Sequence, residues 1–238
     1  VAAPGGGGGG SRGGLAAVGG DNGIEAGEDG RGEGVVGDVV ASAGNVRILS
    51  SGSVLDADDA SSGDDTDADV TALSLSVSAG KGVGLLSGNS LGLPVNALDT
   101  SVDVLSVEVV GSDGVNILEA NGLTIGDAAE VTVRKVRWEA STVEQVRLSQ
   151  SDVVVTDING ANGSVVIRVS AGNLAIEEGT AKADLSDAAV VSHGSGNILL
   201  EAMAAGGAFT IGAKADVLTV REEAGLPVTG SGHITLLA

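Results

Sequence analysis

Residues 116–133 read NILEANGLTIGDAAEVTV, and residues 197–220 read NILLEAMAAGGAFTIGAKADVLTV. Each stretch has an Asn before a short apolar run, then a run that ends in Thr-Ile-Gly, then a run rich in Val. The recurrence of several strand-like runs in the same order is the sequence signature of a repeat architecture, in which each unit stacks on the next. This internal repeat decides the fold prediction.

A shorter unit recurs more widely along the chain. It consists of Gly, then Asn, Ser or His, then an alternating apolar run, and it occurs at Gly44-Asn45, Gly163-Ser164, Gly172-Asn173, Gly196-Asn197 and Gly232-His233. Gly and Asn suit the tight or left-handed corners that separate short strands. Helical spacing of apolar residues is not sustained anywhere. We therefore predict an all-β fold.

The composition indicates which kind of all-β fold this is. The chain of 238 residues has 40 Gly and three Pro but only one Phe, one Trp and no Tyr. An antiparallel sandwich is the competing all-β fold, and its wide core normally uses aromatic side chains. A parallel β-helix, or β-solenoid, has a narrow interior that stacked Val, Ile, Leu and Ala can fill. The composition and the repeat together predict a parallel β-solenoid.

Several protein classes are excluded by the same numbers. The glycines follow no G-X-Y period, which excludes collagen. A hydrophobic fraction of 42% argues against a disordered polyanion. The net charge of −20 argues against a nucleic-acid partner, and no apolar run is long enough for a membrane span. Because there is no Cys, the chain has neither a disulfide framework nor a thiolate metal site.

The domain prediction has two parts. Residues 1–43 form a glycine-rich flexible or loop segment, and residues 44–238 form the β-solenoid repeats, with insertions near 56–69 and 134–150. An alternative for the first part is that its Val pairs at 35–36 and 39–40 already form narrow strands.

The repeats resemble a known family. Residues 163–168, 171–176, 194–202 and 230–238 are similar to the repeats of giant bacterial exoproteins of the filamentous-haemagglutinin-like class, which are surface adhesins. The resemblance implies a right-handed parallel β-helix, an extracellular or cell-surface location, and a role in adhesion, matrix or filament building. The resemblance rests on the pattern of the repeats, because no catalytic signature accompanies it.

The strongest local feature is a cluster of aspartates, namely Asp56, Asp58, Asp59, Asp64, Asp65, Asp67 and Asp69. Calcium takes six to eight oxygen ligands, and alternating residues of an extended segment point to one side. Asp65, Asp67 and Asp69 are therefore the candidate calcium ligands, although the spacing is not that of an EF-hand. The alternative interpretation is a solvated acidic loop that keeps the chain soluble.

Two further groups of residues are candidates for catalytic or binding sites. His193 and His233 both adjoin Gly-Ser-Gly sequences, which indicates turn residues and not catalytic ones. The basic and aromatic group Arg134, Lys135, Arg137, Trp138 and Arg147 suits contact with a glycan or another partner. Its alternative is an excursion that covers the side of the solenoid, with Trp138 buried.

We expect a non-catalytic structural or adhesive segment of a secreted bacterial surface protein, forming a rigid rod or filament. Its partners would be further copies, end to end or laterally, and glycans or a neighbouring cell surface. The run 234–238 ends in a strand motif with no polar cap, which predicts either a longer parent chain or end-to-end stacking. The alternative function is a β-helical polysaccharide lyase or hydrolase, although aromatic sugar platforms are nearly absent.

Overall fold

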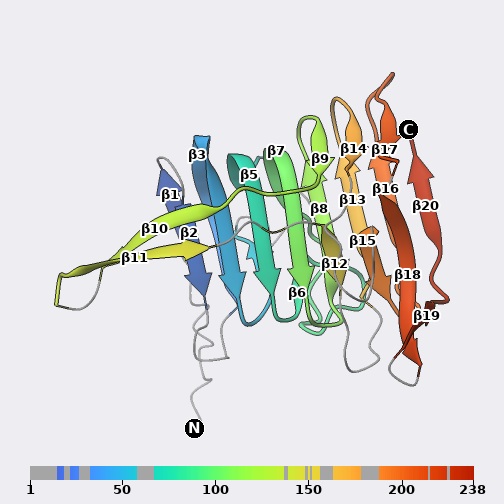
Figure 1. Cartoon of the computed structure of the whole chain (residues 1–238), viewed down its shortest axis with the longest axis horizontal. Helices are drawn as coiled ribbons and strands as arrows, with labels where there is room; N and C mark the ends of the chain where they lie inside the picture. The colour runs from blue at the N-terminus through green and yellow to red at the C-terminus, as the bar shows by residue number, and fades with distance from the viewer. Residues whose placement is uncertain are drawn as a thin grey trace, which may run out of the picture.

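The computed structural model describes residues 15–18, 22–26, 33–57, 67–136, 139–147, 150, 152–155, 163–177, 188–213, 215–223 and 226–238. Within these ranges the regular elements are all β-strands, and most of them pair in parallel. None of these residues belongs to a helix long and apolar enough to cross a membrane. Figure 1 shows the strands side by side in one array, from β1 and β3 in blue to β20 in red. The predicted all-β class and the predicted parallel pairing are confirmed.

The first ladder of parallel strands runs the length of the array. Its members are β2 (Asn22–Ala26), β3 (Gly34–Ser50), β5 (Val70–Ala79), β7 (Leu98–Val109), β12 (Val153–Val155), β15 (Ala188–His193) and β18 (Asp216–Glu223), and β1 (Leu15–Val18) pairs with the first part of β3. Ile48, Val77 and Val107 are successive partners in this ladder, and Val153 continues the column. Like residues therefore lie over like residues.

Two more ladders complete the array. The second contains β4 (Val54–Asp56), β6 (Gly82–Val83), β8 (Gly114–Glu119), β13 (Val165–Val169), β16 (Ile198–Ala202) and β20 (Ile234–Leu237), and the third contains β9 (Leu123–Ile125), β14 (Leu174–Ile176) and β17 (Phe209–Ile211). The two copies of the sequence repeat occupy β8 with β9 and β16 with β17. Strands β13 and β14 lie between them, so the copies are two strands apart in the same ladders.

The third run of the first repeat copy leaves the array. Residues 131–133 belong to β10 (Val131–Val136), which pairs antiparallel with β11 (Thr142–Arg147). The repeat predicts that this run lies in the first ladder. That position is occupied by β12, which pairs with β7 on one side and with β15 on the other. A local antiparallel partner satisfies the backbone of β10, so its Val-rich sequence does not force it into the ladder. In Figure 1 the hairpin crosses β2 and β3 and projects beyond them.

A thin aliphatic core runs between the ladders. In β9, β13, β14 and β16 alternate residues point inward and are buried, as Val165, Ile167 and Val169 are on β13. The residues between them, such as Val166, are only partly buried. The period of two in the sequence produces this alternation, because successive side chains of a strand point to opposite faces.

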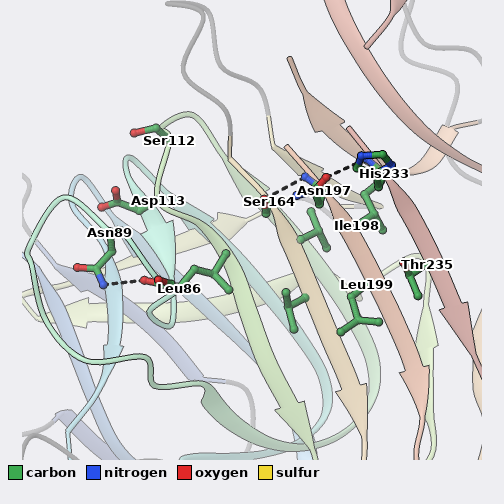
Figure 2. Close-up of a pocket in the computed structure, with 14 residues that line it drawn as sticks. Leu86, Asn89, Ser112, Asp113, Ser164, Asn197, Ile198, Leu199, His233 and Thr235 are labelled. Atoms are coloured by element: carbon green, nitrogen blue, oxygen red, sulfur yellow. Dashed lines mark hydrogen bonds between the residues drawn. The ribbon is translucent and has the colours of Figure 1, made fainter. Parts of the chain in front are cut away.

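Glycine corners set the close approach of successive strands. A Cβ on Gly196 would fall on the carbonyl oxygen of Gly163, and a Cβ on Gly232 would fall on that of Gly196. The polar residue after each glycine joins the strands as well. Ser164 Oγ accepts a hydrogen bond from the Asn197 N–H at 3.0 Å, and Asn197 Oδ1 accepts one from the His233 N–H at 2.8 Å (Figure 2). Three of the predicted glycine-polar units, at 163–164, 196–197 and 232–233, are therefore corners stacked in one column. The unit at 172–173 lies at another corner, where Asn173 Oδ1 accepts a hydrogen bond from the Ala208 N–H at 2.9 Å. The corner predicted at Gly44-Asn45 is wrong, because both residues lie inside β3.

The predicted boundary between residues 43 and 44 falls inside a strand. β3 begins at Gly34 and contains both Val pairs, of which Val36 and Val39 are fully buried. The strand alternative for these pairs is therefore what the structure shows. The six consecutive glycines at 5–10 lie outside the described residues.

Candidate functional sites

Of the three candidate calcium ligands, the structure describes Asp67 and Asp69. Asp65 lies outside the described residues, as do Asp58, Asp59 and Asp64. Asp67 is exposed, whereas Asp69 is only 4% exposed. Among the described residues, Asp69 is instead grouped with two carboxylates from other strands.

The acidic cluster consists of Asp56, Asp69 and Asp99. Asp56 is the last residue of β4, Asp69 precedes β5, and Asp99 is the second residue of β7. The register of β5 and β7 pairs Val70 with Thr100, which places the two preceding aspartates side by side. The Asp99 N–H donates to Asp69 Oδ2 at 3.0 Å, and one oxygen from each of the three carboxylates lies within 4.8 Å of the others.

Asn96 adjoins this cluster. Its Nδ2 donates to Asp56 Oδ2 at 3.0 Å, and its side chain is only 7% exposed. Its Oδ1 is buried and has no hydrogen-bond partner among the described residues. A buried amide oxygen without a partner lowers the stability of a fold by about 1–3 kcal/mol. Asn96 therefore destabilises the fold unless another group or an ion binds its Oδ1.

The electrostatics of the cluster follow from burial. Removal from water, the negative charge of Asp56 and a side-chain hydrogen bond with Asp56 raise the pKa of Asp69 to about 9, and the Asp99 N–H opposes this only in part. Near neutral pH, and without a cation, Asp69 therefore holds a proton. Closely spaced carboxyl groups cannot all ionise at low cost.

Sequence reasoning found Asp56 and Asp69 but missed Asp99 and Asn96. A signal for Asp99 is present in the repeat, because residues 68–77 (ADVTALSLSV) align with residues 98–107 (LDTSVDVLSV). In that alignment the two aspartates coincide, which predicts that they stack. Asn96 lies in the excursion between β6 and β7 and has no such signal.

A second buried carboxyl lies on β8. Glu119 is fully buried and accepts hydrogen bonds from the Thr100 hydroxyl at 2.7 Å, from the Val102 N–H at 3.1 Å and from the Asn121 N–H at 3.0 Å. Burial raises the pKa of Glu119 to about 7, and these hydrogen bonds limit the rise. Its side chain joins β7 to the corner after β8, which is a structural role.

A groove of about 690 Å³ lies on the outer face of the second ladder. One wall is the excursion after β6, with Leu86 and Asn89, and the floor is formed by residues of β13, β16 and β20 (Figure 2). Asp113 is its lining carboxylate, and it accepts hydrogen bonds from both the N–H and the hydroxyl of Ser90. His233 also lines it, and no Lys, Arg or aromatic residue does among the described residues. The groove therefore holds no carboxylate pair for acid–base chemistry.

The other predicted residues are placed as follows. His193 ends β15, and His233 precedes β20. Arg134, Lys135 and Arg147 lie on the β10–β11 hairpin, and their side chains are not described. Arg137 and Trp138 lie outside the described residues, so the glycan-contact interpretation stays a prediction.

The last strands of the array expose apolar side chains. Ile234 is 42% exposed and Leu236 is 41% exposed on β20, and Ile211 at the end of β17 is 41% exposed. Their ladder partners Ile198 and Leu200 are buried. Among the described strands β20 has a parallel partner on one side only, and that partner is β16.

Comparison with known proteins finds no matching family model, no similar curated protein and no similar solved structure. The function is therefore argued from the geometry of the chain itself.

Proposed function

We propose that the chain is a β-solenoid rod with a non-catalytic structural or adhesive role on a bacterial surface. The observation that carries this proposal is the column of like residues in consecutive strands of one ladder. Two such columns are Val115, Val165, Ile198 and Ile234, and Ile117, Ile167, Leu200 and Leu236. Stacked aliphatic columns give a stiff body whose length grows with each added unit.

The order in which the chain visits the ladders supports the solenoid. Strands β13, β14 and β15 lie in the second, third and first ladder, and β16, β17 and β18 follow in the same order. We call one such passage through the ladders a rung. From β12 onward the parallel pairs join equivalent strands of successive rungs, as a solenoid requires. The long strands β3 and β7 also pair in parallel with β4, β8 and β9. The resemblance of residues 194–202 and 230–238 to surface adhesin repeats supports the right-handed sense and the surface location.

The open rung at β20 supports self-association. Among the described strands β20 pairs with β16 alone, so its other edge and the exposed Ile234 and Leu236 are available to a further strand. Such an edge is a template for another parallel strand. We propose that a second copy adds its first rung there, end to end. The net charge of −20 opposes this contact at low salt, so screening should promote it.

Sedimentation velocity of the 238-residue chain tests the proposal. Over a rising concentration series at high salt we expect elongated oligomers, which negative-stain images show as rods. Leu236→Lys should abolish the association, because it places a charge in the apolar contact. Leu73→Lys is the matched control, since Leu73 is 43% exposed on β5 and away from the open rung.

A chain that stays a compact monomer at every concentration and salt would contradict end-to-end stacking. Equal loss of association in both variants would show that the contact is not at β20. An elongated monomer that does not associate would support the rod and contradict the end-to-end stacking. The polysaccharide-active alternative has less support, because the Asp113 carboxylate in the groove already accepts two hydrogen bonds from Ser90.

A further inference from the structure

We propose that the acidic cluster of Asp56, Asp69 and Asp99, together with Asn96, binds one calcium ion. This inference does not depend on the proposed function. The ligands come from separate parts of the chain. Asp56 ends β4, Asp69 precedes β5, Asp99 is the second residue of β7, and Asn96 lies in the excursion between β6 and β7.

The spacing of the carboxylates suits calcium. One oxygen from each lies within 4.8 Å of the others. Two oxygens on opposite sides of a calcium ion at about 2.4 Å are about 4.8 Å apart. The three oxygens are therefore close enough for side-chain adjustments to bring them around one cation. Calcium prefers this all-oxygen ligand set.

Asn96 is the second, independent observation. Its amide is more than nine-tenths buried and lies against Asp56, yet its Oδ1 has no partner among the described residues. In the structure Nδ2 faces Asp56, and rotation of the amide by half a turn would turn Oδ1 toward Asp56 instead. A cation between Asn96 and Asp56 would then bind Oδ1 and neutralise the neighbouring carboxylates, while Nδ2 would take the position that Oδ1 now occupies. A purely structural Asn at this position would not need a buried oxygen left unbonded.

An ion has a route to the cluster. Asp99 lines a cavity of about 160 Å³, together with Thr100 and Ser170. Asp56 is itself partly exposed. Water molecules entering by these routes would complete the six to eight ligands that calcium takes. The bound ion would fasten the excursion that holds Asn96 to strands β4 and β7.

Isothermal titration of the chelator-treated full chain with CaCl2 tests the proposal. Moderate salt screens weak binding to the many surface carboxylates. We expect one calcium per chain in the tightest step, and a rise in melting temperature on adding calcium. Asp99→Asn should abolish that step, and Asn96→Ala should weaken it about tenfold or more. Asp103→Asn is the matched control, because Asp103 is exposed on the same strand, β7.

Manganese added to the isotope-labelled wild-type chain locates the ion without any substitution. Paramagnetic broadening should be strongest at the amides of the acidic cluster, and calcium in excess should reverse it. This measurement keeps the test valid if Asp99→Asn fails to fold. Broadening centred on residues 58–66, no calcium-linked rise in melting temperature, or equal binding by Asp99→Asn and Asp103→Asn would each overturn the proposal.

Discussion

Strands β13 and β20 belong to the same ladder and carry similar residues, yet they differ in burial. Val165 and Ile167 on β13 are fully buried, whereas Ile234 and Leu236 on β20 are about two-fifths exposed. β13 lies between β8 and β16, and β20 pairs with β16 alone among the described strands. Burial in this fold is therefore conferred by the next strand along the ladder and not by residue type. Each strand covers half of its neighbour.

The largest expected effect on stability comes from truncating a side chain that faces the core. Ile167→Ala removes a fully buried side chain and leaves a cavity between β8 and β16, which we expect to cost about 2–5 kcal/mol in the free energy of unfolding. Leu236→Ala, at the equivalent position of β20, should cost less than about 1 kcal/mol, because much of its area is already in water. Urea unfolding of both variants measures the difference. Equal costs would show that β20 is covered in solution.

The glycine corners should give the next largest effect. Gly196→Ala puts a methyl group on the carbonyl of Gly163, and we expect a loss of about 1–3 kcal/mol in the free energy of unfolding. Gly206 has a φ of +84° but open space around its Cβ position. Gly206→Ala should cost only about 1 kcal/mol, which is the penalty for a left-handed Ala. Thermal unfolding of the two variants compares them, and the reverse ranking would contradict the stacked corner.

A buried inner carboxyl should make stability depend on pH. The pKa of Glu119 is about 7 in the folded chain, above its value in an unfolded chain, so the folded chain holds the extra proton between these values. The free energy of unfolding should therefore fall as pH rises from about 4.5 to about 7, by at most about 1.4 kcal/mol per pH unit. Above that range Glu119 makes no further contribution to the slope.

Glu119→Gln should flatten this part of the pH profile, because Gln stays neutral like the protonated acid. Glu201→Gln on β16 removes a partly exposed carboxylate and controls for the change in net charge. Guanidinium unfolding at several pH values, in chelator-treated buffer, measures the slopes. An unchanged slope in Glu119→Gln would mean that another group causes the dependence.

The polar column should show the smallest effect. Asn197→Ala removes the acceptor of the His233 N–H, and we expect a loss of about 0.5–1 kcal/mol confined to β20. Asn197→Asp keeps an oxygen at that position and should retain the bond. Hydrogen exchange at the amides of β20 reports the loss locally, with β13 as an internal reference. Equal exchange in both variants would show that β20 is held by its ladder pairing alone.

Much of the fold could be predicted from local sequence. The short Val-rich and Ile-rich runs are strands, the glycine-polar units at 163–164, 196–197 and 232–233 are corners, and the repeat copies at 116–126 and 197–212 occupy matching ladder positions. The run at 131–133 could not be placed in this way. Its residues match those of β18, but pairing with β11 removes it from the ladder.

The candidate site could be predicted only in part. The many aspartates at 56–69 indicated the correct region of the chain, at the end of β4. The alternation of side chains in an extended segment, however, predicted that Asp69 groups with Asp67. The structure groups it with Asp99, which lies 30 residues further along the chain. Spacing within one segment carries no information about which segment stacks above it.

The amino-acid sequence by itself determined the strands, their corners and the parallel stacking, because alternation, glycine and the repeat act over a few residues or through identical units. Only the tertiary structure decided the register between rungs, the departure of the hairpin and the meeting of Asp56, Asp69, Asp99 and Asn96. The physical reason is that these contacts join residues far apart in the sequence, as Asp69 and Asp99 are, and only the stacking of the strands brings such residues together.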